Sequence, residues 1–147
     1  MNQQQQSAQH YQAQQIMNAS KEQLLLMLFD GAVRFLKIAK KALAENDVPT
    51  CHTHLLKTQK IMSELMTSLN FEVGGDVARN LYNLYEYYYY RLVQANLKKD
   101  PAMIDEVLGH LQDLRSTWNE AIKQAAVAKG AQAKAADAGG TGQLYKV

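Results

Sequence analysis

Residues Ser20–Leu43, SKEQLLLMLFDGAVRFLKIAKKAL, decide the fold of this chain. The segment begins like a helix, because Ser20 can cap the first turn and Gln23 stands three residues later, where a capping box needs Glu or Gln. No proline interrupts the segment, and Gly31 is its only weak helix former. We therefore predict a helix over residues 21–45.

This predicted helix is apolar around nearly its whole circumference. At about 100° per residue, one broad face suits a core and holds Leu24, Leu28, Phe35, Ala39, Ala42 and Leu43. The remaining circumference carries Leu26, Met27, Phe29, Val33 and Ile38. A helix of this kind has to be covered on more than one side. Its first half therefore needs a second partner besides the core.

Three more helical segments follow, over residues 49–70, 77–98 and 101–127. Pro49 and Pro101 each stand in a first turn, where proline is tolerated, and Gly74-Gly75 marks a loop. We expect Asp76 to cap the third helix. Helices of this length with short connections predict an all-α fold, an antiparallel four-helix bundle of residues 20–127.

Both ends of the chain are poor in apolar residues. Residues 1–19 are glutamine-rich and residues 128–147 consist largely of small and polar residues, so neither segment buries enough surface to fold alone. We predict a flexible N-terminal segment and a disordered C-terminal tail. Tyr11, Ile16 and Met17 can form a hydrophobic staple at the first helix or lie over its surplus apolar face, and the two interpretations do not exclude each other.

Composition argues against several classes of protein. The 147 residues fit one domain, and the net charge of +2 with interspersed acids and bases argues against a surface for nucleic acid or anionic membranes. No apolar segment reaches the roughly 18–20 residues of a membrane span, and no signal-peptide pattern is present. The single Cys51 suits a reducing compartment. We expect a cytoplasmic protein that neither binds nucleic acid nor inserts into a membrane.

No motif for catalysis, a cofactor or a metal is present in the sequence. His52 and His54 are two residues apart and therefore point to different sides of a helix. Glu106 and His110 lack the second copy that a di-metal bundle needs. Gly74-Gly75 lacks the lysine and the spacing of a phosphate-binding loop. We expect no enzyme, no cofactor and no metal site.

Tyrosines and aliphatic residues form a second stripe on the third helix. Tyr82, Tyr89 and Val93 belong to it, and they either shield edges of the core or form part of a binding surface. An apolar excess on two helices, with a movable N-terminal segment, is typical of a bundle that receives a partner helix. The residues that we expect to line such a groove are Leu26, Met27, Phe29, Val33, Tyr82, Tyr89 and Val93.

The order of short motifs along the chain resembles the FliS family, the flagellar export chaperones that bind flagellin. The matching positions are Tyr11, Ala19-Ser20, Leu24, Met27–Ala32, Leu65–Leu69, Gly74-Gly75, Asn80-Leu81, Leu84-Tyr85, Arg91-Leu92, Ala95-Asn96, Asp100, Glu106-Val107, Leu114-Arg115 and Trp118. There are two departures. Lys21 stands where the family usually has proline, and Tyr88 and Tyr90 stand where it tends to carry methionine and arginine.

The resemblance implies a function that the residue patterns alone do not. Family members bind the C-terminal segment of new flagellin, which becomes helical and wraps around the bundle; this prevents premature polymerisation and keeps flagellin ready for the flagellar type III export apparatus. The resemblance implies that Tyr11, with Ile16 and Met17, covers the empty groove and contacts the export-gate membrane protein. The alternative is a bundle that self-associates as a homodimer through the same apolar surface, without flagellin.

Overall fold

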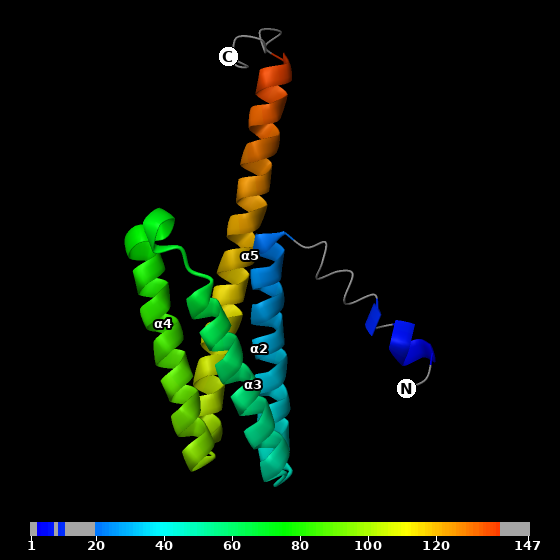
Figure 1. The fold of residues 1–147 in the computed structure, drawn as a ribbon, viewed down its shortest axis with the longest axis vertical. Coiled ribbons are helices and arrows are strands. Elements are labelled where there is room, and N and C mark those ends of the chain that lie inside the picture. The colour runs from blue at the N-terminus through cyan, green and yellow to red at the C-terminus, as the bar shows by residue number, and fades with distance from the viewer. Residues whose placement is uncertain (1–2, 8, 11–19, 139–147) are drawn as a thin grey trace. The chain divides into compact units, whose positions relative to one another are not determined.

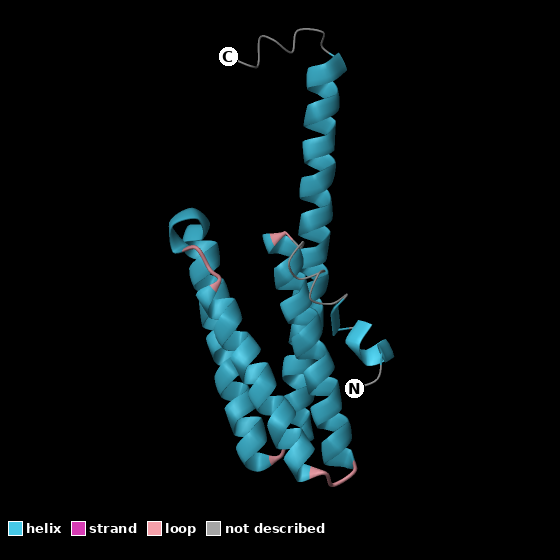
Figure 2. Ribbon diagram, turned by 45° about the vertical axis from the view of Figure 1, so that its right-hand side comes forward, coloured by secondary structure: helices cyan, strands magenta, loops and turns pink. Residues whose placement is uncertain are grey.

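The computed structural model describes residues 3–7, 9–10 and 20–138. Within residues 20–138 four helices follow one another: α2 (Lys21–Ala44), α3 (Val48–Thr67), α4 (Phe71–Lys98) and α5 (Pro101–Ala138) (Figure 1). No strand occurs in the part of the chain that is described (Figure 2). The chain divides into two compact units, Met1–Arg115 and Ser116–Val147, and α5 runs from the first into the second.

Side chains cap the starts of α2, α3 and α5, and the capping box predicted for α2 is confirmed. The Ser20 hydroxyl accepts from the Gln23 N–H at 3.2 Å, and the Gln23 side chain accepts from the Ser20 N–H at 3.2 Å, which completes the capping box of α2. The Asp47 carboxylate accepts from the Thr50 N–H at 3.3 Å at the start of α3. The Asp100 carboxylate accepts from the Ala102 N–H at 2.9 Å at the start of α5.

The first unit is the predicted antiparallel four-helix bundle. Short connections pair α2 with α3 and α3 with α4, and α5 returns beside α2. Arg115 Nε donates to Asp30 Oδ1 at 2.9 Å, and Lys40 Nζ lies 2.7 Å from Asp105 Oδ1. Residue numbers therefore rise along α2 as they fall along α5, so these helices are antiparallel. Because α5 also contacts α4, α2 and α4 lie diagonally across the bundle.

The core face of α2 differs from the predicted one. The buried residues are Phe29, Ala32, Leu36, Ala39 and Ala42. Of the predicted core residues, Ala39 and Ala42 are buried, whereas Leu24 is exposed and Phe35 is half-buried. The sequence pattern was misleading because a helix that is apolar all round has no single face that its hydrophobicity alone identifies.

The start of α4 also differs from the prediction. We expected the second helix to end at residue 70 and the third to start at residue 77. Instead α3 ends at Thr67, and the Asn70 side chain caps α4 by accepting from the Glu72 and Val73 N–H groups, both at 3.1 Å. The expected interruption is present as a kink at Gly75, where φ is 51° and ψ is −124°.

The ends of the chain are more helical than we predicted. The helix α5 continues through Ala138 instead of ending near residue 127, because alanine, lysine and glutamine have high intrinsic helix propensity even without a core to pack on. Residues 3–7 and 9–10 are helical as well, in contrast to the irregular N-terminal segment that we expected.

Two glycine substitutions test the kink. Gly75→Ala should lower the free energy of unfolding by about 1–3 kcal/mol, because a Cβ disfavours this positive-φ conformation. Gly109→Ala is the matched control, since a Cβ there meets nothing within 4 Å, and it should raise the free energy of unfolding by about 1 kcal/mol. Urea unfolding followed by circular dichroism measures both. Equal effects of the two substitutions would contradict the kink.

Candidate binding surfaces

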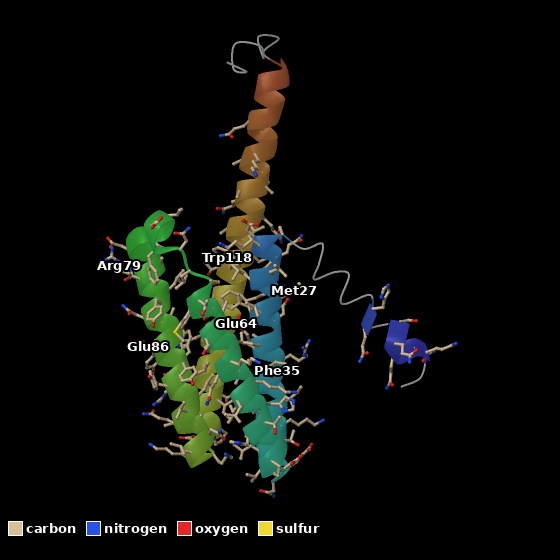
Figure 3. All side chains as sticks on the ribbon, in the orientation of Figure 1. Met27, Phe35, Glu64, Arg79, Glu86 and Trp118 are labelled. Atoms are coloured by element: carbon tan, nitrogen blue, oxygen red, sulfur yellow. The ribbon has the colours of Figure 1, made fainter. Side chains whose placement is uncertain are left out.

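The structure separates the candidate groove residues of α2. Phe29 belongs to the core, with an exposed fraction of 3% and its ring centroid 6.4 Å from that of Tyr85. It is therefore not a surface residue, and its predicted role in a groove is wrong. Leu26 and Val33 are half-buried. Met27, which is labelled in Figure 3, is exposed, with an exposed fraction of 37%. These three side chains reach the surface.

The candidate residues of α4 all lie at the border of the core. Tyr82, Tyr89 and Val93 are half-buried, whereas Tyr85 and Tyr88 on the same helix are fully buried. The Tyr89 ring packs edge-on against the exposed Tyr90 ring, with centroids 5.4 Å apart and an interplanar angle of 81°. The stripe therefore shields the core and is also open on its outer side, and its role as a binding surface stays a prediction.

Leu26 and Val33 lie on the flank of α2 that faces α5. Both are one helical turn from Asp30, which forms the ion pair with Arg115 of α5. Residues three and four apart share a helix face. We call Leu26 and Val33 the α2 stripe.

Tyr82, Tyr89 and Val93 lie on the flank of α4 that faces α3. Val93 is one turn from Asn96, whose side-chain amide donates to His52 Nδ1 of α3 at 2.9 Å. Tyr89 and Tyr82 continue the same face at intervals of four and seven residues. We call these three residues the α4 stripe.

The α3–α4 contact adds a residue that we did not include among the candidates. In this antiparallel pair the contact between His52 and Asn96 places Leu56, one turn along α3, level with Val93. Leu56 has an exposed fraction of 46%. Its position outside the core stripe of α3 was visible in the sequence, but the register of α3 against α4 was not.

The predicted groove residues therefore belong to two flanks of the bundle. The α2 stripe borders α5, and the α4 stripe borders α3, so the two lie on opposite sides of a ring ordered α2, α3, α4, α5. A partner that contacts both stripes has to pass around the bundle. Tyr11, Ile16 and Met17 lie outside the described residues, and their predicted role stays a prediction.

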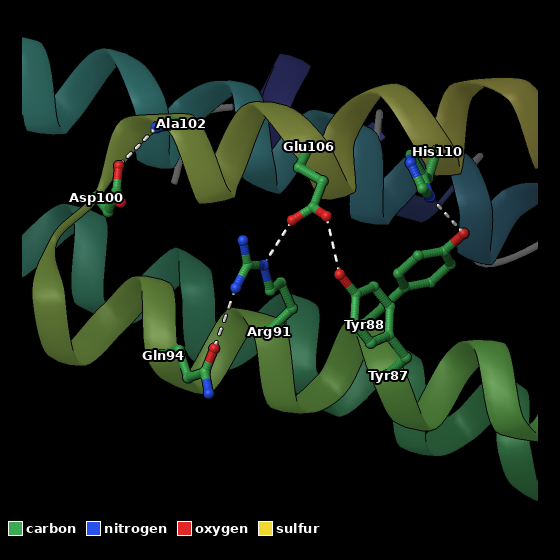
Figure 4. Close-up of polar contacts among 8 residues, drawn as sticks. All are labelled: Tyr87, Tyr88, Arg91, Gln94, Asp100, Ala102, Glu106 and His110. Carbon is green, nitrogen blue, oxygen red and sulfur yellow. Dashed lines mark hydrogen bonds and ion pairs between the residues drawn. The ribbon is translucent and has the colours of Figure 1, made fainter.

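A polar network holds the other flank of α4 against α5 (Figure 4). Glu106 of α5 accepts from Arg91 Nε at 2.5 Å and from the Tyr87 hydroxyl at 2.8 Å. The hydrogen bond from Arg91, followed by that from Tyr87, lowers the pKa of the Glu106 carboxyl below its usual value. This flank of α4 is therefore occupied by contacts within the bundle.

Tyr88 adds a second contact between α4 and α5. Burial raises the pKa of Tyr88 to about 12, so its phenol stays neutral near pH 7. Its hydroxyl lies 3.0 Å from His110 Nδ1, and the two rings pack edge-to-face at 5.5 Å. Glu106 and His110 thus each have a partner on α4, which is a structural role for both residues.

Comparison with known proteins identifies the family. The sequence model described as "Flagellar protein FliS" matches residues 3–125. The chain belongs to the FliS family. The Flagellar secretion chaperone FliS of Bacillus subtilis is 35% identical over 113 residues, which are 77% of this chain and 84% of that protein. That of Salmonella typhimurium is 41% identical over 106 residues, which are 71% and 78%.

The fold is shared with a solved structure. A crystal structure of a flagellar chaperone from bacteria superimposes with a TM-score of 0.67 at 20% identity, over 81% of this chain and 97% of that one. The relatives in the FliS family are named as chaperones, which confirms the expectation of a protein that is not an enzyme. Within the described residues, no helix is both long and apolar enough to cross a membrane.

The acidic end of the pH range tests the α4–α5 network. The pKa of Glu106 is lower in the folded than in the unfolded chain, so its stabilisation is complete above the unfolded value and is lost as the pH falls through the folded value. Glu106→Gln should lower the free energy of unfolding at pH 7 and have a smaller effect below the folded pKa. Urea unfolding of both proteins from neutral to acidic pH measures the two free energies of unfolding.

The matched control is Glu86→Gln, an exposed acid on α4. Because Glu86 is exposed, the substitution should change the free energy of unfolding little at neutral pH. A difference between wild type and Glu106→Gln that stays constant from neutral to acidic pH would contradict the proposed network.

Proposed function

We propose that this chain is a cytoplasmic export chaperone for flagellin. It binds the C-terminal segment of flagellin as helix, prevents premature polymerisation and delivers the subunit to the flagellar type III export apparatus. The observation that carries the proposal is the match to the FliS family over residues 3–125, in which the relatives are named flagellar secretion chaperones.

The surface of the bundle supports a helical client. The α2 stripe and the α4 stripe are apolar and incompletely covered, and Met27, Leu56 and Tyr90 add exposed apolar side chains. Amphipathic helices bind such surfaces through apolar anchors at successive turns. Because the stripes lie on opposite sides of the bundle, a client that covers both has to wrap around it, as the family resemblance implies.

The N-terminal segment gives the chaperone a means of sensing its client. We propose that residues 11–17 cover part of the apolar surface of α2 when the client is absent and leave it when the client binds. This exchange is a population shift driven by differential affinity and needs no nucleotide. It would expose Tyr11 for the export-gate protein only when flagellin is loaded.

Titration calorimetry of the full chain with a flagellin C-terminal peptide tests the proposal. We expect one-to-one binding, a negative heat-capacity change and a gain of helix, because the peptide folds on an apolar surface. Tyr89→Ala should weaken binding by about 1–2 kcal/mol or less, since the contacts are spread over a long surface.

The control is Tyr87→Ala, which removes the same side chain from the opposite flank of α4 and should leave the affinity unchanged. Equal weakening by both substitutions would overturn the assignment of the α4 stripe. No binding at tens of micromolar peptide would overturn the flagellin proposal. A mass that rises with protein concentration would then favour self-association.

A further inference from the structure

The α2–α3 hairpin concentrates positive charge. Between residues 31 and 63 the sequence has six Lys and Arg residues and two Asp and Glu residues. Of the two acids, Asp47 is the cap of α3 and Glu45 ends α2, so both lie at the connection between the helices. Six cations and two acids give this segment a net charge of +4, whereas Glu22, Asp30 and Glu64 lie in the parts of the hairpin outside it.

Two of these cations lie beside one aromatic side chain, and two more follow on the same helix faces. Arg34 Cζ lies 5.3 Å and Lys57 Nζ lies 5.4 Å from the centroid of the Phe35 ring. Lys41 is seven residues beyond Arg34 on the same face of α2, and Lys60 is one turn beyond Lys57 on α3. We call Arg34, Lys41, Lys57 and Lys60 the basic patch.

The basic patch has no acidic partner within the described residues. The ion pairs in that part of the chain are Lys40–Asp105, Arg79–Asp76, Arg91–Glu106 and Arg115–Asp30. Lys40, on the flank of α2 toward α5, is thus neutralised within the bundle, whereas the four exposed cations of the patch are not.

Apolar side chains lie among these cations. Ile38, with an exposed fraction of 36%, is four residues after Arg34 and three before Lys41, so it lies between them on one face of α2. Phe35 is half-buried beside it and contacts the edge of the His54 ring, with centroids 5.7 Å apart. A complementary ligand therefore carries carboxylates around a large apolar side chain.

We propose that the basic patch docks an acidic amphipathic helix of a partner protein other than the flagellin segment. Gly31 and Ile61 are level across the hairpin, because a Cβ on Gly31 would lie 3.4 Å from Ile61 Cδ1. Lys60 is therefore level with the turn of α2 that contains Gly31, and Lys41 lies about 15 Å further along α2. That length matches about three turns of helix, with carboxylates at successive turns and an apolar side chain on Ile38.

The geometry favours a protein partner over nucleic acid or a membrane. Two cations already lie over the Phe35 ring, where a nucleic acid base would have to stack. A helix that lies in a membrane interface buries a continuous apolar face, whereas this face of α2 has Ile38 between two cations. The patch is separate from the α2 and α4 stripes, although Lys60 lies one turn from Leu56 and Arg34 two turns from Met27.

The test measures binding of synthetic peptides to the full chain by fluorescence anisotropy. The first peptide is a helix of about three turns with glutamates around a central leucine. A second replaces every glutamate with glutamine, and a third replaces the leucine with serine. We expect the first peptide to bind, and the other two to bind at least about tenfold more weakly because one lacks the charges and the other the apolar contact.

Two charge-reversal variants locate the binding. Lys41→Glu/Lys57→Glu should weaken binding of the first peptide at least about tenfold while leaving the flagellin-peptide titration unchanged, which also shows that the bundle is folded. Lys123→Glu/Lys129→Glu makes the same change in net charge outside the hairpin and should have little effect.

Three outcomes would overturn the proposal. They are equal weakening by the two variants, equal binding of the glutamate and glutamine peptides, and tighter binding of phosphatidylglycerol vesicles or single-stranded oligonucleotides than of the glutamate peptide. Because the flagellin titration is measured on the same variants, failure of this proposal is distinguishable from failure of the flagellin proposal.

Discussion

The rest of the structure depends on which side of α2 the core takes. Toward the core, α2 presents three alanines together with Phe29 and Leu36, whereas larger aliphatic side chains such as Met27 and Ile38 face outward. Small residues at a helix contact let backbones approach closely, so α2 packs on its neighbours with little side-chain volume between them. Most of its large apolar side chains are therefore incompletely covered by the bundle.

The faces of α4 also differ in how completely the bundle covers them. Its flank toward α5 is occupied by the hydrogen bonds from Tyr87 and Arg91 to Glu106, and its buried face carries Tyr85 and Tyr88. Its flank toward α3 is held at one end by the contact between Asn96 and His52. Tyr82 and Tyr89, nearer the start of α4, remain half-buried on this flank. Polar contacts thus join α4 to both neighbours at defined positions, and incompletely covered apolar side chains lie between them.

The sequence predicted the fold and most helix starts because those signals are local. Ser20 caps α2 as expected, since a cap depends on a few neighbouring residues. The side of α2 that faces the core was not predictable, because it depends on the neighbouring helices, and Phe29 was therefore misplaced. Asn70, and not the expected Asp76, caps α4, because one helical turn forms before the kink at Gly75. The basic patch was missed because net charge hides a local excess.

Amide hydrogen exchange of the full chain, alone and with the flagellin C-terminal peptide, tests the central claim most directly: a client covers the apolar surface that the core leaves open. We expect slower exchange on binding around residues 26–33 of α2 and 82–93 of α4, with faster exchange of residues 11–17 as they leave α2. Binding that slows exchange elsewhere in the bundle, with these three segments unchanged, would contradict it.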